Sequence, residues 1–289
     1  MSGVPVKNSV QRESISTGWQ SRLWIPVLLL GAIAVRVAGL EFRSIDIQDF
    51  LLDWYSSLAM HGFQALRQPF SNYTPPYLYL LYLATRTNGL IPDVVAIKLI
   101  SIFFDLVNAF LVYKILKIRY PDGMLAWMGA AVFLVLPTVL LNSAYWGQAD
   151  AIYTCFLLAC LLFLLKEQPL PAMIFLGIAF GFKAQAVFLA PFILLLVVKR
   201  IIPLLYLGII PLVYLLLMVP AALTGRPMLD LLTIYLDQAG VYQSLSEHAP
   251  NLYLFISNRF YSPVAAIGIG VTALVVVTWV ILYAHKLKG

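Results

Sequence analysis

Two aspartates, Asp46 and Asp49, follow the first long apolar run of the chain in the segment IDIQDF. Where hydrocarbon gives way to water, a carboxylate is partly desolvated and can still be reached by a substrate from either phase. A base that takes a proton from a hydroxyl at a lipid surface needs such a position. Both residues are therefore candidate catalytic bases, although two solvated acids that open an interfacial helix would suit the helix dipole equally well.

A second group of polar and aromatic residues crowds a short connection, NSAYWGQADA, between two apolar runs. Trp146, Gln148 and Asp150 are the members that suit a sugar. An aromatic face packs on the C–H side of a pyranose, while amides and carboxylates bond its hydroxyls. The connection therefore predicts either a sugar site or an ordinary aromatic belt at the membrane boundary.

Lysine 183 is an isolated cation between two short apolar runs, in the segment AFGFKAQAVFLAP. A lysine in such a place is costly unless it snorkels to the surface or meets an anion, and a lipid phosphate is the obvious anion. Arg36, near the end of the first apolar run, raises the same question. Lys183 and Arg36 are therefore candidate phosphate ligands, and Gln185 is a candidate substrate contact. For Lys98 and Asp105, which share one apolar run, we expect structural partners.

The segment 224–262 carries two further polar candidates, His248 and Asn251. They are possible contacts to an acceptor or a phosphate, and nothing near His248 has metal-ligand spacing. Cys155 and Cys160 both lie in one apolar run, where cysteine is more often a small core residue than part of a disulfide or metal pair.

The composition requires a lipid bilayer as solvent. Apolar residues make up 62% of the 289 residues and charged residues 11%, with a mean hydropathy of +0.89. Backbone groups in hydrocarbon must pair within the protein, and long unbroken apolar runs select helices over a barrel. The net charge of +6 comes from basic residues at the ends of apolar runs, as in cytosolic anchors, so we expect no nucleic-acid partner. The sequence predicts an all-α membrane protein.

A span needs roughly 20 apolar residues, and the chain offers about eight candidates. They are residues 23–40, 92–116, 124–143, 151–165, 170–183, 184–198, 201–223 and 263–284. The short run Tyr77–Leu83 is left out, because counting it would put the basic residues of 114–119 outside, against the positive-inside rule. Residues 1–22 are then a polar cytosolic tail, and 23–289 form a polytopic helical bundle with both termini in the cytosol.

Most of the thirteen acidic residues then fall on the outer side of the membrane. Acids are not needed to orient the chain, so carboxylates gathered there indicate chemistry on that side. Two large outer loops are predicted, 41–91 and 224–262. In the first, apolar residues at near-helical spacing predict an amphipathic interfacial helix, and Tyr77, Tyr79 and Tyr82 suit the headgroup level.

These clusters, in this order and on this side, resemble the GT-C superfamily of glycosyltransferases that use polyprenyl-phosphate sugars. The likeness is to bacterial relatives of the mannosyltransferases of GPI-anchor assembly and of the glucosyltransferases of N-glycan precursor assembly, and it covers roughly residues 23–255. The motifs that carry it are Asp46 with Phe50 and Trp54, Tyr73–Pro76, Asp105, Trp146–Asp150, and Lys183 with Gln185.

The resemblance implies an inverting transfer of one hexose or mannose-like sugar to a lipid-linked or cell-envelope acceptor. Asp46 would be the base, and Tyr73 would join the sugar-binding residues. Asp49 is an acid beyond the family pattern, so the choice of base stays open. The resemblance also implies no metal and no cofactor, although Asp46, Asp49 and Asp150 could share a divalent cation.

Two other functions remain open. A flippase for a lipid-linked sugar could hold its cargo with the same basic and aromatic residues, although the doubled architecture common in transporters is not seen. A noncatalytic membrane subunit is the second alternative. Short loops suggest a bacterial cytoplasmic membrane, with the site on its periplasmic or extracellular face.

Overall fold

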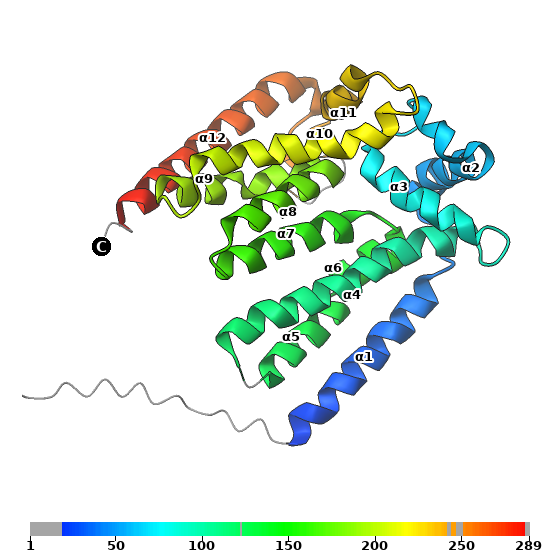
Figure 1. Ribbon diagram of the computed structural model, residues 1–289, viewed down its shortest axis with the longest axis horizontal. Helices are drawn as coiled ribbons and strands as arrows, with labels where there is room; N and C mark the ends of the chain where they lie inside the picture. The colour runs from blue at the N-terminus through cyan, green and yellow to red at the C-terminus, as the bar shows by residue number, and fades with distance from the viewer. Residues whose placement is uncertain (1–18, 122, 242–243, 247–250, 287–289) are drawn as a thin grey trace, which may run out of the picture.

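The protein is all-helical in its described residues, as the sequence predicts. A computed structural model describes residues 19–121, 123–241, 244–246 and 251–286, and these form twelve α-helices and no strand (Figure 1). The helices are α1 Trp19–Gly39, α2 Leu52–His61, α3 Pro75–Ala84, α4 Asp93–Arg119, α5 Met124–Val135, α6 Pro137–Leu140, α7 Asp150–Leu165, α8 Pro169–Phe182, α9 Ala190–Val198, α10 Ile209–Ala222, α11 Met228–Val241 and α12 Tyr261–Lys286.

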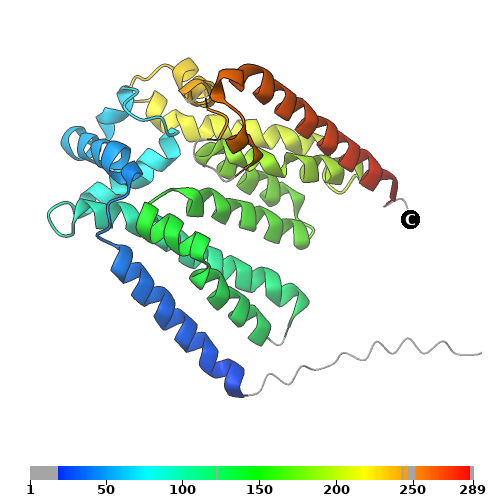
Figure 2. The same cartoon turned by 180° about the vertical axis from the view of Figure 1, so that it is seen from behind.

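The long helices form a row of neighbours. Helix α5 packs against α1 and α4, α7 packs against α4 and α8, and α10 packs against α8. Helix α12 contacts α9 at the edge of the row. Helices α2, α3 and α11 lie together at one end of the molecule, where α1 ends and α4 begins (Figures 1 and 2). The segments predicted to face outward therefore gather at one end of the bundle.

Within the described residues, three helices are long and apolar enough to cross a membrane, or four if a bent pair counts as one span. They are Asp93–Arg119, Leu204–Ala222, Asn258–Ala284 and the bent pair Met124–Val135 with Pro137–Trp146. The remaining apolar helices have only 10–17 residues. The predicted total of about eight spans therefore stays a prediction. The shorter helices result from breaks, such as the 3₁₀ turn Ala184–Leu189 between α8 and α9.

A proline causes the bend in the predicted span 124–143. Pro137 has no N–H to continue the helix and restricts Leu136, which is extended at φ −57° and ψ 128°. The two halves meet at 51°. The break frees the carbonyl of Leu134, which accepts a hydrogen bond from Arg36 Nη1 at 2.8 Å. The bend therefore leaves no unpaired carbonyl at that position.

A stripe of polar residues runs along one face of α4. Its members are nearly fully buried and spaced at three and four residues, as helical neighbours are. They are Lys98, Ser101, Asp105 and Asn108. Ser101 Oγ donates to the carbonyl of Gln148 at 2.6 Å, and Asn108 Nδ2 donates to that of Ala151 at 2.9 Å. The stripe thus binds the irregular backbone that leads into α7.

Lys98 and Asp105 both have structural partners, as expected, but not each other. Lys98 Nζ donates to the carbonyls of Gly39 and Phe42 at 2.6 Å each and so holds the end of α1. Asp105 Oδ2 pairs with Arg36 Nη2 at 2.8 Å and accepts from Ser143 Oγ at 2.5 Å. These bonds join α1 and α4 to the turn that follows α6.

The predicted outer loop 41–91 is a packed part of the fold. A π-helical turn, Ile47–Leu51, leads directly into α2, so the segment is helical where the sequence predicts a helix, and its place at the membrane interface stays a prediction. Its Trp54, Tyr55 and Leu58 are buried in the largest apolar core together with residues of α3 and α10. Two tyrosines expected at the headgroup level also lie inside. Tyr77 is fully buried, and Tyr79 Oη donates to the carbonyl of Leu217 at 3.0 Å.

Candidate active site

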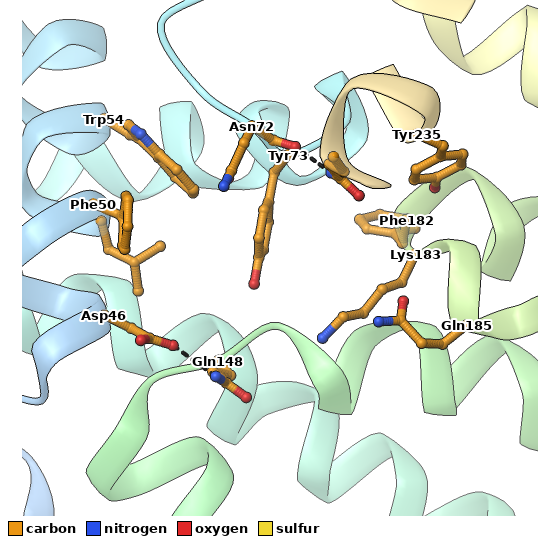
Figure 3. A pocket seen from close by; sticks show the side chains of 12 residues that line it. Asp46, Phe50, Trp54, Asn72, Tyr73, Gln148, Phe182, Lys183, Gln185 and Tyr235 are labelled. Carbon is orange, nitrogen blue, oxygen red and sulfur yellow. Dashed lines mark hydrogen bonds between the residues drawn. The ribbon is translucent and has the colours of Figure 1, made fainter. Parts of the chain in front are cut away.

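A cavity of about 320 Å³ lies where α2, α3 and α11 meet the ends of the long helices (Figure 3). Its lining residues come from five separate parts of the chain and combine one acid, amides, one lysine and aromatic rings. They are Asp46, Phe50, Leu51, Trp54, Asn72, Tyr73, Gln148, Phe182, Lys183, Gln185, Tyr235 and Gln238. The cavity thus contains five of the residues that the sequence analysis selected: Asp46, Tyr73, Gln148, Lys183 and Gln185.

The carboxylate of Asp46 is fixed by a hydrogen bond. Its Oδ2 accepts from Gln148 Nε2 at 2.6 Å, and its side chain is half-buried (Figure 3). The backbone just before it is held as well, because Ser44 Oγ donates to the carbonyl of Trp146 at 2.7 Å and accepts from the N–H of Ile47 at 3.3 Å. The elbow after α1 therefore presents one acid to the cavity in a defined position.

Lys183 enters the cavity from the break between α8 and α9. Its backbone is extended, at φ −154° and ψ 132°, so α8 stops and the side chain turns into the hollow (Figure 3). The carbonyls of Gly181 and Phe182 accept from Thr74 Oγ1 at 2.7 and 3.3 Å, which ties the break to the segment before α3. Lys183 Nζ forms an ion pair with Asp150. A cation is therefore available at the cavity wall.

The acid and the lysine are linked by a chain of side-chain hydrogen bonds. Asn142 Nδ2 donates to Gln148 Oε1 at 3.2 Å and to Asp150 Oδ2 at 2.8 Å. Gln148 holds Asp46 at one end, and Asp150 holds Lys183 at the other. Residues far apart in the sequence thus form one connected network, and its members Asp46, Gln148 and Lys183 line the cavity as its polar floor, whereas Asn142 and Asp150 lie behind them.

Aromatic rings form the wall opposite this floor. The ring centroids of Phe50 and Trp54 are 6.1 Å apart and those of Trp54 and Tyr73 5.1 Å. Tyr77 does not line the cavity but supports the ring of Tyr73, with the centroids 5.1 Å apart. The hydroxyl of Tyr73 points into the hollow (Figure 3). An apolar wall facing a floor of amides and charges suits a sugar, whose ring faces are apolar and whose edges are polar.

Three polar lining residues were missed by the sequence analysis: Asn72, Tyr235 and Gln238. Gln238 Nε2 donates to the carbonyl of Asn72, and Tyr235 Oη donates to that of Phe180. Burial raises the pKa of Tyr235 well above its usual range, so its hydroxyl remains a donor. The sequence does contain one indication for two of them: Tyr235 and Gln238 are three residues apart, so a helix would place both side chains on the same face.

Several other candidates lie away from the cavity. Asp49 is exposed on the helix after Asp46 and does not line the hollow. Trp146 is 41% exposed and also does not line it, so the aromatic wall is formed by other residues. Asn251 is exposed and caps its own turn by accepting from the N–H of Tyr253 at 2.9 Å. His248 lies outside the described residues.

Arg36 is not brought to the cavity with Lys183. Its side chain is buried, and its guanidinium donates to Asp105 and to the carbonyls of Ala32 and Leu134. The cation is thus committed to structural partners in the bundle, because an uncompensated charge at that depth would be costly. Lys183 is the cation that lines the hollow.

Metal-ligating groups do not gather in the described part of the chain. No three side chains of His, Cys, Asp or Glu there come close enough to hold one ion. Cys155 and Cys160 are buried in α7 with free thiols. The site offers a proton acceptor, a cation, oriented amides and an aromatic wall. Together these groups suit acid–base chemistry on a substrate in which a neutral polar part is joined to an anionic group.

Comparison of the chain with family models, curated proteins and solved structures finds no match.

Proposed function

We propose that the protein is a membrane glycosyltransferase that moves one sugar from a polyprenyl-phosphate donor to an acceptor hydroxyl with inversion. The observation that carries the proposal is that Asp46 and Lys183 line the same small cavity. The acceptor is a lipid-linked or cell-envelope glycan. No cofactor is required, and membrane lipids surround the site.

The proposed reaction needs a base and a phosphate ligand. The acceptor oxygen attacks the anomeric carbon, its proton passes to Asp46, and the bond between that carbon and the phosphate oxygen breaks. The phosphate leaves as a stable anion, so no strong general acid is needed. Lys183 exchanges its contact with Asp150 for the phosphate and neutralises the charge that develops there.

The remaining lining residues orient the sugar in this proposal. Gln148 has one N–H left over from its bond to Asp46, and Gln185 and the hydroxyl of Tyr73 face the same hollow (Figure 3). The ring of the sugar packs on the wall that contains Trp54. Because the sugar is oriented when it binds, part of its translational and rotational entropy is lost at the binding step, and the free-energy barrier of the reaction is lower.

We further propose that the chain crosses a bacterial cytoplasmic membrane about eight times, with the cavity on the outer face and both termini in the cytosol. This topology uses the shorter apolar helices as spans. It is supported by the basic residues of 114–119, which lie in the last turns of α4, and by those at 166 and 199–200, which lie in connections; all of them are away from the end that holds the cavity.

The proposal is tested with the purified protein in lipid vesicles and a labelled polyprenyl-phosphate hexose. A transferase converts the donor to polyprenyl phosphate only when an acceptor alcohol is present. A flippase instead exposes the donor on the opposite leaflet without an acceptor. No consumption of donor with any of a panel of hexoses and lipid-linked acceptors would count against the transferase.

Replacing Lys183 with methionine should weaken donor binding by about 10–100-fold. A charge-assisted hydrogen bond contributes about 1.5–3 kcal/mol, and methionine keeps the length of the side chain without its charge. Binding of polyprenyl phosphate to the protein in detergent measures the effect. Lys166→Met is the matched control, because Lys166 is exposed beyond the far end of α7. Equal affinities in the two variants would remove Lys183 from the phosphate site.

A further inference from the structure

The hydrogen bond from Gln148 to Asp46 depends on which way the amide of Gln148 points. An amide end group has an NH₂ on one side and an oxygen on the other, and only the NH₂ stabilises a carboxylate. In the structure the NH₂ faces Asp46 Oδ2 at 2.6 Å. Turned around, the amide would place its oxygen against the carboxylate, and two acceptors would repel each other. Asp46 itself therefore favours the orientation seen, and a second contact at the other end of the amide can fix it.

Asn142 makes that contact. Its Nδ2 has two hydrogens and two acceptors, Gln148 Oε1 at 3.2 Å and Asp150 Oδ2 at 2.8 Å. If either amide were reversed, a donor would face a donor or an oxygen would face a carboxylate. The two carboxylates at the ends of the chain, Asp46 and Asp150, accept hydrogen bonds only. One orientation of both amides therefore satisfies every contact.

The backbone holds Asn142 and Gln148 in register. Asn142 lies in a π-helical turn, Leu141–Trp146, and its carbonyl accepts from the N–H of Gln148 at 3.0 Å. Gly147, between them, adopts φ +75°, and a Cβ there would lie 2.9 Å from Ile47. A glycine is thus required for the reversal of direction that brings the two amides together.

We infer that Asn142 is a positioning residue that fixes the amide of Gln148 so that its NH₂ faces Asp46. It acts through Gln148 and does not line the cavity itself. Because it also holds Asp150, the partner of Lys183, it links the acid end of the cavity to the cationic end. The inference rests on the proposed function for the roles of those two ends.

The test uses a spectroscopic readout that does not require activity. With isotope-labelled aspartate, the infrared difference between the protein and its Asp46→Asn variant isolates the carboxylate band of Asp46. In Asn142→Leu this band should shift in the same direction as in Gln148→Leu, which removes the donor outright, but by a smaller amount, because Asp46 alone still favours the NH₂. Asn142→Asp, which keeps the shape of the side chain but has no N–H, should give the same shift if the leucine variant does not fold.

Asn108→Leu is the matched control. Asn108 is a buried asparagine whose Nδ2 donates to a backbone carbonyl of the same region, that of Ala151, and not to the side chain of Gln148 or Asp150. A purely structural role for Asn142 predicts that both variants lower stability and leave the Asp46 band unchanged. That result would overturn the inference.

A kinetic arm separates this inference from the proposed function. If the protein transfers sugar, Asn142→Leu should lower kcat about tenfold with little change in the KM for the donor, while Asn108→Leu should change neither per folded molecule. Absence of transfer by the unaltered protein would refute the proposed function, yet the infrared band would still decide whether Asn142 orients Gln148. Transfer with an unshifted band and an unchanged kcat would refute the inference alone.

Discussion

Replacing Asp46 with asparagine is expected to reduce sugar transfer by a factor of about 10²–10⁴, the usual contribution of a positioned general base. Asparagine keeps the size of the side chain and can still bond to Gln148, but it cannot accept the proton of the acceptor hydroxyl. Donor binding should change little, because the proposed phosphate ligand, Lys183, is untouched. Turnover of labelled donor and binding of polyprenyl phosphate measure the two effects separately.

Asp49 and Asp53 provide controls from the same short helical segment. Both are exposed acids outside the cavity, so their asparagine variants should retain transfer within about threefold. This comparison also decides between the two candidate bases of the sequence. Loss of activity in Asp49→Asn with full activity in Asp46→Asn would exclude Asp46 as the base.

The largest expected loss of stability comes from Asp105→Asn, at about 3–5 kcal/mol. Asp105 is 2% exposed and is the carboxylate that pairs with buried Arg36 at 2.8 Å. Asparagine is close in shape but leaves the guanidinium without a counter-charge inside the bundle. Loss of folded protein during detergent denaturation measures the change.

A double variant isolates the uncompensated charge as the cause. Arg36→Met with Asp105→Leu removes both charges, and we expect it to recover most of the loss, because apolar pairs often replace buried ion pairs at little cost. Asp93→Asn is the control on the same helix, since Asp93 is half-buried at its first turn and should contribute only about 0.3–1 kcal/mol. Equal losses in Asp105→Asn and the double variant would assign the effect to packing.

Most helix positions could be predicted from the sequence because hydrophobic runs dominate the pattern. The predicted spans 92–116 and 263–284 agree with α4 and α12 to within a few residues at each end. Breaks inside a run were harder to predict. The run 124–143 reads as one span by hydropathy, yet Pro137 divides it, because hydropathy counts side chains and ignores the missing N–H.

The packing of the segment 41–91 could not be predicted from its pattern. Aromatic residues suit both a headgroup region and a protein core, so Tyr77 and Tyr79 gave no signal that separates the two. The structure buries Tyr77 fully and Tyr79 in part, because α3 packs against α2 and α10. Only the tertiary arrangement decides which surface covers such side chains.

The sequence identified those members of the candidate site whose charge is energetically costly to place near a membrane. Asp46 and Lys183 stand out in the sequence. One is an acid at a membrane boundary and the other a lone lysine between apolar runs, and a charge in such a position is unfavourable unless it has a partner or a function. Arg36 stood out for the same reason but has a structural partner, and sequence alone does not separate the two cases. Gln238 and Asn72 carry no charge, so no energetic argument selects them before the fold is known.

The polar stripe of α4 also constrains the order in which the chain is built into the bilayer. Helix α4 is apolar enough to cross a membrane, but Lys98, Asp105 and two further polar groups would raise the cost of inserting it without partners. Arg36 and the carbonyl of Gly39 are synthesised before it and can neutralise or bind two of these groups as α4 leaves the ribosome. Partners from the connection before α7 arrive later. Helix α4 is therefore expected to enter the membrane together with α1, as a pair.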